Sequence, residues 1–193
     1  MKHFYQNIQG WFTYPSLYSK VVSNAPDKAH FVEVGVWKGT SAAYMAVEII
    51  NSGKNIKFDC IDTWNGSSEH LDINSSVYEP GMVEDKDFLY NTFIEGMKPV
   101  EGHYTAYRTT SIEASKQYED NSLDFVFIDA AHDYDSVKAD IEAWIGKVKE
   151  GGILAGHDYG WYPGVNKAVD EVLGRENISQ QEGCWYLPIK FRV

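Results

Sequence analysis

Residues 29–50, AHFVEVGVWKGTSAAYMAVEII, join a short apolar run to a helical pattern through a turn that contains two glycines. The run from Phe31 to Val34 is short, apolar and mostly β-branched or aromatic, which favours a strand. The segment from Thr40 to Ile50 is long enough for a helix, and Thr40 and Ser41 are residue types that cap helices. We therefore predict a strand, a tight glycine turn and a helix capped by Thr40 or Ser41, the first unit of an α/β sheet.

The same alternation of short apolar runs and helical patterns continues along the chain. Further strands are expected at Ile56 to Ile61, Tyr104 to Tyr107, Leu123 to Ile128 and Gly152 to Ala155, with weaker ones near Ile178 and from Trp185 to Phe191. Further helices are expected at Asp85 to Met97, Ile112 to Tyr118, Ser136 to Val148, capped by Asp135, and Val165 to Leu173, entered through Pro163. This pattern predicts an α/β, Rossmann-like, doubly wound fold with a mostly parallel seven-stranded sheet and helices on both faces.

The length and composition of the chain favour one domain. A chain of 193 residues with 44% hydrophobic and 15% aromatic residues can bury a core of its own. We expect a single domain over residues 1–193, with an N-terminal helical cap over 1–28 that includes a short helix from Trp11 to Val22. Residues 65–84 lack periodicity and are rich in polar residues, so we expect a lid or substrate loop there.

The charge and the apolar pattern argue against several classes of partner. The formal net charge of −11 repels phosphate backbones and anionic lipids, so no nucleic acid and no membrane is expected as a partner. No apolar run has the length of a signal peptide or a membrane span, which favours a cytoplasmic protein. Cys60 and Cys184 stand far apart in apolar segments, and we expect both to be buried thiols.

Two acidic residues accompany the first two strands. Glu33 precedes the glycine turn, and Asp62 ends the second strand, where a carboxylate can accept hydrogen bonds from the hydroxyls of a ribose. Trp64 can stack on a ligand or simply pack, and we favour the ligand role for Asp62 only. The glycine pattern alone is weak, because βα turns in domains that bind nothing also use glycine, and it is not Gly-x-Gly-x-x-Gly.

The later strands carry the most informative side chains. The strand from Leu123 to Ile128 is followed by Asp129 and His132, and the next strand is followed by His157 and Asp158. Neighbouring parallel strands end at the same edge of a sheet, where open α/β sheets bind their ligands. We therefore expect these four side chains to meet in one crevice.

These stretches resemble the class I S-adenosylmethionine-dependent methyltransferases. The resemblance covers most of the chain between Ala29 and Leu173 and rests on residues 31–39, Asp62, 127–134 and 151–159. More narrowly, the pairing of IDAAHDY at 128–134 with GGILAGHDY at 151–159 resembles the branch with the sugar and macrolide O-methyltransferases and the cephalosporin hydroxylase-like proteins.

The resemblance implies roles for individual residues. It implies that Glu33, Gly35 and Gly39 surround the amino-acid part of the cofactor, with Asp62 at its ribose and Ser111 near its adenine. The expected cofactor-binding set comprises Glu33, Gly35, Gly39, Thr40, Ser41, Asp62, Thr63, Ser111 and Asp129. In metal-dependent relatives the positions of Asp129, His157 and Asp158 bind a divalent ion. His132 matches the base, so the expected catalytic residues are His132 and Asp129.

Because the expected metal set contains a histidine, the sequence does not determine which metal ion it binds. Mg²⁺ prefers oxygen ligands, whereas a set that contains His157 suits Mn²⁺, Fe²⁺ or Zn²⁺ equally well or better. The alternative is a site without metal, in which His157 orients Asp158 or hydrogen-bonds a substrate. Two alternatives therefore remain: a divalent ion, Mg²⁺ or Mn²⁺, bound in addition to S-adenosylmethionine, or S-adenosylmethionine alone.

Three functions fit these residues. We expect an S-adenosylmethionine-dependent methyltransferase that acts on a hydroxyl of a small-molecule acceptor. The alternatives are a catalytically silent protein that binds S-adenosylmethionine or a nucleoside and, more weakly, a nicotinamide-dependent oxidoreductase, which needs room for a second nucleotide-binding half. Exposed aromatic residues could also form a homodimer interface.

Overall fold

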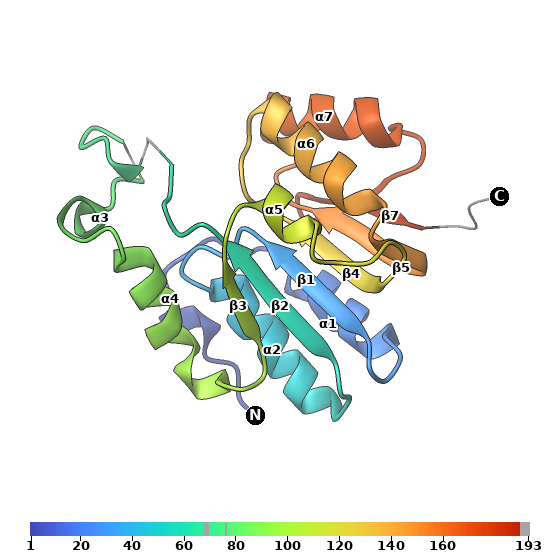
Figure 1. The fold of residues 1–193 in the computed structure, drawn as a ribbon, viewed down its shortest axis with the longest axis horizontal. Coiled ribbons are helices and arrows are strands. Elements are labelled where there is room, and N and C mark those ends of the chain that lie inside the picture. Colours follow the sequence, from blue (N-terminus) through green and yellow to red (C-terminus); the bar gives the residue numbers. More distant parts are fainter. Residues whose placement is uncertain (68–69, 76, 190–193) are drawn as a thin grey trace.

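The computed structural model describes residues 1–67, 70–75 and 77–189, which form one seven-stranded sheet with helices on both faces (Figure 1). The strand order is β3-β2-β1-β4-β5-β7-β6. The strands are β1 (His30–Val34), β2 (Lys57–Asp62), β3 (Thr105–Arg108), β4 (Leu123–Ile128), β5 (Val148–Gly156), β6 (Ser179–Gln181) and β7 (Cys184–Pro188). The helices are α1 (Pro15–Asn24), α2 (Thr40–Ser52), α3 (Pro80–Glu84), α4 (Phe88–Met97), α5 (Ser111–Ser115), α6 (Tyr134–Ile145) and α7 (Pro163–Leu173), with 3₁₀ turns η1 (Tyr5–Asn7) and η3 (Lys98–Val100). The predicted fold class is confirmed.

The sheet reverses its order of strands between β1 and β4. Strand β1 pairs in parallel with β2 on one side and with β4 on the other, and β5 continues in parallel from β4. Only the end of the sheet formed by β7 and β6 is antiparallel among the described strands. The carboxyl ends of β1 and β4 therefore lie at the switch point, where open α/β sheets bind ligands.

Two hydrophobic cores lie on opposite faces of the sheet. Helices α1, α2 and α4 cover one face, and α5, α6 and α7 cover the other (Figure 1). Successive side chains of a strand point to opposite faces, so Phe31 joins the first core whereas Val32 and Val34 join the second. Glu33 points to the first face and is only 1% exposed, which makes it an unusual carboxylate within an apolar layer.

The predicted cap of α2 is wrong. The N-cap residue is Gly39, whose φ of 95° is left-handed, and no side chain caps the helix. The hydroxyl of Thr40 donates instead to the carbonyl of Ile8 at 3.2 Å, and the hydroxyl of Ser41 donates to Glu33. Both hydroxyls are thus used in tertiary contacts, so neither can cap the first turn.

The predicted cap of α6 is also corrected. Asp133 is the N-cap residue, because its extended backbone lets the carboxylate accept a hydrogen bond from the backbone N–H of Ser136 at 3.0 Å. Asp135 lies inside the first turn, where a negative charge still interacts favourably with the helix dipole. The predicted position of Pro163 at the entry to α7 is confirmed.

Several element boundaries differ from the predicted ones. The N-terminal helix α1 begins at Pro15 rather than Trp11, and α4 begins at Phe88, after its N-cap Asp87, rather than at Asp85. The expected loop over residues 65–84 contains the short helix α3, which begins at a proline, a residue suited to a first turn. The last predicted strand is observed as β7, and its predicted end at Phe191 lies outside the described residues.

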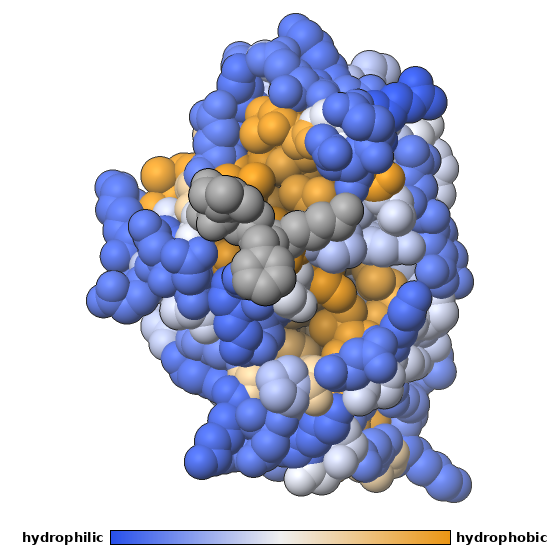
Figure 2. Space-filling model, turned by 90° about the vertical axis from the view of Figure 1, so that its right-hand side faces the viewer, coloured by the Kyte–Doolittle hydropathy of each residue, from blue (hydrophilic) through white to orange (hydrophobic). Residues whose placement is uncertain are grey.

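Hydrophilic residues dominate the molecular surface that faces the viewer in Figure 2. Apolar residues gather in central areas of that face. Cys60 and Cys184 are buried free thiols, as predicted. None of the described helices combines the length and the apolar character that a membrane span requires.

Candidate functional site

Asp62, at the end of β2, holds the glycine turn in place. One of its carboxylate oxygens accepts hydrogen bonds from the backbone N–H groups of Val36 and Trp37, at 3.0 and 2.9 Å. The other accepts from the N–H of Trp64 at 2.7 Å. Burial raises the pKa of Asp62, while the backbone donors act in the opposite direction. The acid thus fixes the loop between β1 and α2 from the neighbouring strand.

Glu33 is the most strongly perturbed acid near this turn. One of its oxygens accepts the hydrogen bond from Ser41, and the other is buried without a hydrogen-bond partner in the described part of the chain. Burial raises the pKa of Glu33 to about 8, and the negative charges of Asp129 and Asp62 add to this rise. Glu33 in β1, Asp62 in β2 and Asp129 after β4 therefore lie close enough to interact electrostatically.

Gly35 lets β1 and β4 approach each other. Its φ is +84°, and a Cβ at this position would overlap the backbone carbonyl of Asp129. The backbone N–H of Asp129 in turn donates to the carbonyl of Val34 at 2.8 Å. The glycine turn and the exit of β4 are consequently in direct backbone contact, which places Asp129 beside the turn.

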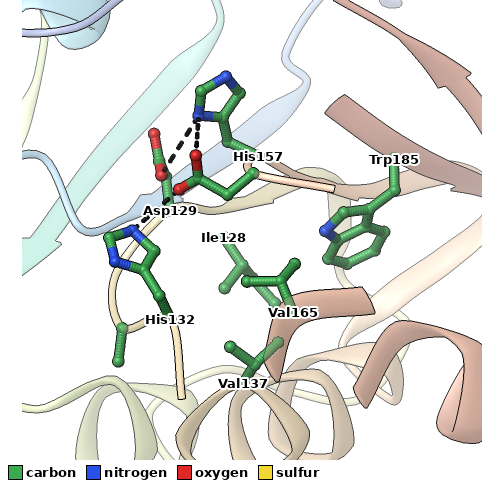
Figure 3. A pocket seen from close by; sticks show the side chains of 9 residues that line it. Ile128, Asp129, His132, Val137, His157, Val165 and Trp185 are labelled. Carbon is green, nitrogen blue, oxygen red and sulfur yellow. Dashed lines mark ion pairs between the residues drawn. The ribbon is translucent and has the colours of Figure 1, made fainter. Parts of the chain in front are cut away.

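Asp129, His132, His157 and Asp158 form one cluster across the exits of β4 and β5. The side chains of Asp129, His132 and His157 converge in Figure 3, in which dashed lines mark the ion pairs among the residues drawn. His132 Nε2 lies 2.9 Å from Asp158 Oδ2, and His157 Nδ1 lies 3.3 Å from Asp158 Oδ1 and 3.8 Å from Asp129 Oδ1. The predicted meeting of these four residues is therefore observed.

Burial and contacts within the cluster shift the pKa values of Asp129, His157 and Asp158. Burial raises the pKa of Asp129 to about 6, although the nearby His157 lowers it. Burial also opposes ionisation of Asp158, but hydrogen bonds with His132 and His157 outweigh burial and hold its pKa well below the usual range. Burial lowers the pKa of His157, but its contacts with Asp158 and Asp129 outweigh this and raise it. Asp158 is thus an ionised carboxylate contacted by two imidazoles.

The backbone of Asp158 is unusual. Its φ of 65° is left-handed, a conformation that asparagine and aspartate tolerate better than most residues do. Such conformations cost about 1–3 kcal/mol and often occur at functional sites. The conformation places one carboxylate oxygen beside each histidine.

The cluster lines a cavity with the volume of a single ion or water molecule. Its volume is about 10 Å³, and its apolar side is formed by Ile128, Val137, Val165 and Trp185 (Figure 3). Asp129, His132 and Asp158 each offer a ligand atom, and these atoms lie within 4.8 Å of one another. These donor types suit a divalent cation. The group contains His132, the predicted base, in place of the predicted ligand His157.

Two residues that the sequence analysis did not assign also contact the cluster. The phenol of Tyr14 donates to Asp129 Oδ2 at 3.0 Å, and Thr13 Oγ1 lies 3.2 Å from His157 Nε2. Both come from the N-terminal segment before α1. The only signal in the sequence is the aromatic content of this segment, which predicts burial but no partner.

The other predicted cofactor residues are placed around the same edge. Thr63 Oγ1 accepts from the backbone N–H of Asn65 at 3.2 Å. Ser111 begins α5, and its hydroxyl accepts from Trp144 Nε1 at 2.9 Å. Trp64 is buried and donates to the carbonyl of Trp37, which agrees with the packing role expected for it.

Comparison with known proteins identifies a family. The family described as a methyltransferase domain matches residues 32–159. A protein of Sinorhizobium fredii designated y4gI is 24% identical over 156 residues, which are 81% of this chain and 16% of that protein. This chain thus spans about one sixth of the length of that relative.

Solved structures share the fold. The O-methyltransferase NovP superposes with a TM-score of 0.64 at 17% identity, over 92% of this chain and 79% of NovP. The TDP-rhamnose 3'-O-methyltransferase CalS11 superposes with a TM-score of 0.55 at 17% identity, over 90% of this chain and 76% of CalS11. At this level of identity the similarity establishes the fold.

Proposed function

The chain belongs to the methyltransferase domain family, and we propose that it uses S-adenosylmethionine to methylate a hydroxyl group of a small-molecule acceptor. The observation that carries this proposal is the contact of His132 with Asp158, which puts a candidate base in one cluster with Asp129, the residue that contacts the glycine turn. The acceptor is proposed as a hydroxylated small molecule because an imidazole suits removal of a hydroxyl proton.

The β1 turn supports binding of the methyl donor. Glu33 has a buried oxygen without a hydrogen-bond partner in the described part of the chain, at the position where the amino-acid part of S-adenosylmethionine, with its ammonium group, is expected. A bound ammonium group would favour the ionised form of Glu33 and so lower its raised pKa. Asp62 accepts three backbone hydrogen bonds. A carboxylate offers about four acceptor positions, so Asp62 retains capacity for one ribose hydroxyl.

Asp129, Asp158 and His157 are proposed as ligands of a divalent cation. His157 Nδ1 faces both carboxylates, which is the arrangement of a mixed nitrogen and oxygen ligand set. Such a set suits Mn²⁺ as well as Mg²⁺. When bound, the ion would supply positive charge that lowers the pKa of an acceptor hydroxyl.

His132 is proposed as the base. Asp158 is ionised and can only accept, so the 2.9 Å contact requires the proton of neutral His132 to lie on Nε2. Nδ1 is then the basic atom. In the transfer step the acceptor oxygen bonds to the methyl carbon, and the carbon–sulfur bond breaks with its electron pair left on sulfur. The hydroxyl proton passes to His132 Nδ1, and S-adenosylhomocysteine is formed.

A calorimetric titration with S-adenosylhomocysteine, with and without Mn²⁺ or Mg²⁺, tests this proposal. We expect binding of S-adenosylhomocysteine and a separate uptake of Mn²⁺ that is lost in His157→Gln. Transfer of a labelled methyl group to a panel of phenols and sugars then identifies the acceptor class. Failure of wild-type protein to bind S-adenosylhomocysteine would overturn the proposed activity.

A further inference from the structure

The segment before α1 crosses the carboxyl edge of the sheet. Residues 8–14, which we call the N-terminal strap, begin at the β1 turn, where the carbonyl of Ile8 accepts from Thr40 and Gln9 Oε1 accepts from Lys38 Nζ at 2.6 Å. The strap ends at the exits of β4 and β5, where it contacts His157 and Asp129. It therefore links the expected cofactor side of the site to the histidine and carboxylate cluster.

Thr13 keeps a proton on Nε2 of His157. The single hydroxyl hydrogen of Thr13 is donated to the backbone carbonyl of Glu182, at 3.3 Å. The 3.2 Å contact of Thr13 Oγ1 with His157 Nε2 must then be donated by the imidazole. Nε2 of His157 is therefore protonated. Nδ1 is the nitrogen that donates to ionised Asp158 and that a cation would engage in place of this proton.

Tyr14 holds the other side of the cluster. Its ring is completely buried and packs against the rings of Phe127 and His157, with centroids 4.8 and 4.7 Å away. Its hydroxyl donates to Asp129 Oδ2, so the second oxygen, Oδ1, is the one that faces His157. A buried ring held on two sides fixes the donor more firmly than an exposed side chain can.

We propose that Thr13 and Tyr14 of the N-terminal strap are positioning residues that orient His157 and Asp129 toward a shared cation. Thr13 keeps Nε2 of His157 protonated and fixes the orientation of its ring, and Tyr14 sets which oxygen of Asp129 faces His157. Partners that hydrogen-bond to metal ligands in this way fix the orientation of the ligands. The part that concerns the cation rests on the proposed function, whereas the protonation of His157 rests on contacts within the chain alone.

Nitrogen-15 NMR of histidine-labelled protein tests the role of Thr13. With the His157 signals assigned through His157→Gln, we expect wild-type Nε2 to be protonated and its proton to exchange slowly with water. Thr13→Val removes the hydroxyl that accepts from His157 Nε2 and keeps the side-chain shape, so exchange of the Nε2 proton with water should accelerate at least about tenfold. Thr13→Ser keeps the hydroxyl and should show the wild-type exchange rate. Ser16→Ala is the matched control, because Ser16 also bonds Glu182 but does not touch the cluster. An unprotonated Nε2, or equal changes in Thr13→Val and Ser16→Ala, would overturn this role.

Titration with Mn²⁺, followed by the electron paramagnetic resonance signal of the free ion, tests the role of Tyr14. Tyr14→Phe should weaken Mn²⁺ binding by about 10–100-fold, the usual effect of losing a partner of a metal ligand. Tyr44→Phe is the control, since its hydroxyl bonds Ser19 at 2.7 Å away from the cluster. Unchanged Mn²⁺ affinity in Tyr14→Phe, or no Mn²⁺ uptake by the wild type, would refute the role of Tyr14.

The two proposals fail in different experiments. A protein that shows the expected His157 signals and Mn²⁺ affinities but does not bind S-adenosylhomocysteine would overturn the proposed methyl transfer and leave the strap contacts supported. A protein that binds S-adenosylhomocysteine but shows none of the expected changes in the Thr13 and Tyr14 variants would do the reverse.

Discussion

His132 Nε2 lies 2.9 Å from Asp158 Oδ2, and this contact joins the residues that follow β4 to those that follow β5. His157 contacts the other oxygen of the same carboxylate, so two imidazoles share one anion. The left-handed backbone of Asp158 makes this shared position available. The proposed base and the candidate metal ligands are thereby held together at the exits of β4 and β5, where the carbonyl of Asp129 approaches Gly35.

The base role predicts a selective loss of activity in His132→Ala. Removing a general base typically lowers turnover by about 100–10,000-fold, whereas the proposed cofactor contacts lie on β1 and β2. With an acceptor in hand, kcat should fall within that range, and the dissociation constant of S-adenosylhomocysteine should change by less than about threefold. Asp129→Asn should also lower kcat, because it removes charge from the cluster. Turnover that is unchanged in both variants would exclude both roles.

Gly35→Ala is expected to be strongly destabilising. The added Cβ would overlap the carbonyl of Asp129, which belongs to the backbone and cannot rotate away, and the φ of +84° is itself unfavourable for alanine. We expect a loss of about 3 kcal/mol or more in the free energy of unfolding, measured by urea denaturation.

Gly53→Ala is the matched control for this prediction. Gly53 also has a left-handed φ, of +67°, but a Cβ there would meet no atom within 4 Å. Only the conformational cost of about 1–2 kcal/mol should remain. Equal losses in the two variants would show that the approach of β1 to β4 is not what requires Gly35.

The order of the elements could be predicted from the sequence, but much of the site could not. Local composition and period identify strands and helices, and the parallel topology then brings Asp129, His132, His157 and Asp158 to one edge. The strap was not predictable in this way, because the contacts of Thr13 and Tyr14 join residues more than 100 positions apart. The cap of α2 was missed for a related reason, since Thr40 is used in a tertiary contact that leaves no local signal.

Buried Glu33 predicts a pH dependence of stability. Its folded pKa is raised from 4.5 to about 8, so the native state binds more protons than the unfolded state between these values. The free energy of unfolding should therefore fall as the pH rises through this window, by an amount on the order of 3–5 kcal/mol from this group. Glu33→Gln, which stays neutral, should remove that part of the slope. Urea denaturation at about pH 5 and about pH 8 measures this change in the free energy of unfolding. The same pH dependence in the variant and in the wild type would contradict the assignment.

The buried ion pair between Lys38 and Glu79 predicts that the segment over residues 65–84 is fastened to the glycine turn. Lys38 is 3% exposed, and its Nζ lies 2.7 Å from Glu79 Oε1 and 2.6 Å from Gln9 Oε1. Removing one partner leaves the other charge buried, which typically costs about 3–5 kcal/mol, whereas replacing both with apolar residues is often neutral. Urea denaturation of Lys38→Met, Glu79→Leu and the double variant should therefore show two large losses that largely cancel when combined. Losses that simply add would mean that the two charges act independently. The segment would then be held to the turn by its other contacts, such as the contact between the tilted rings of His70 and Trp37.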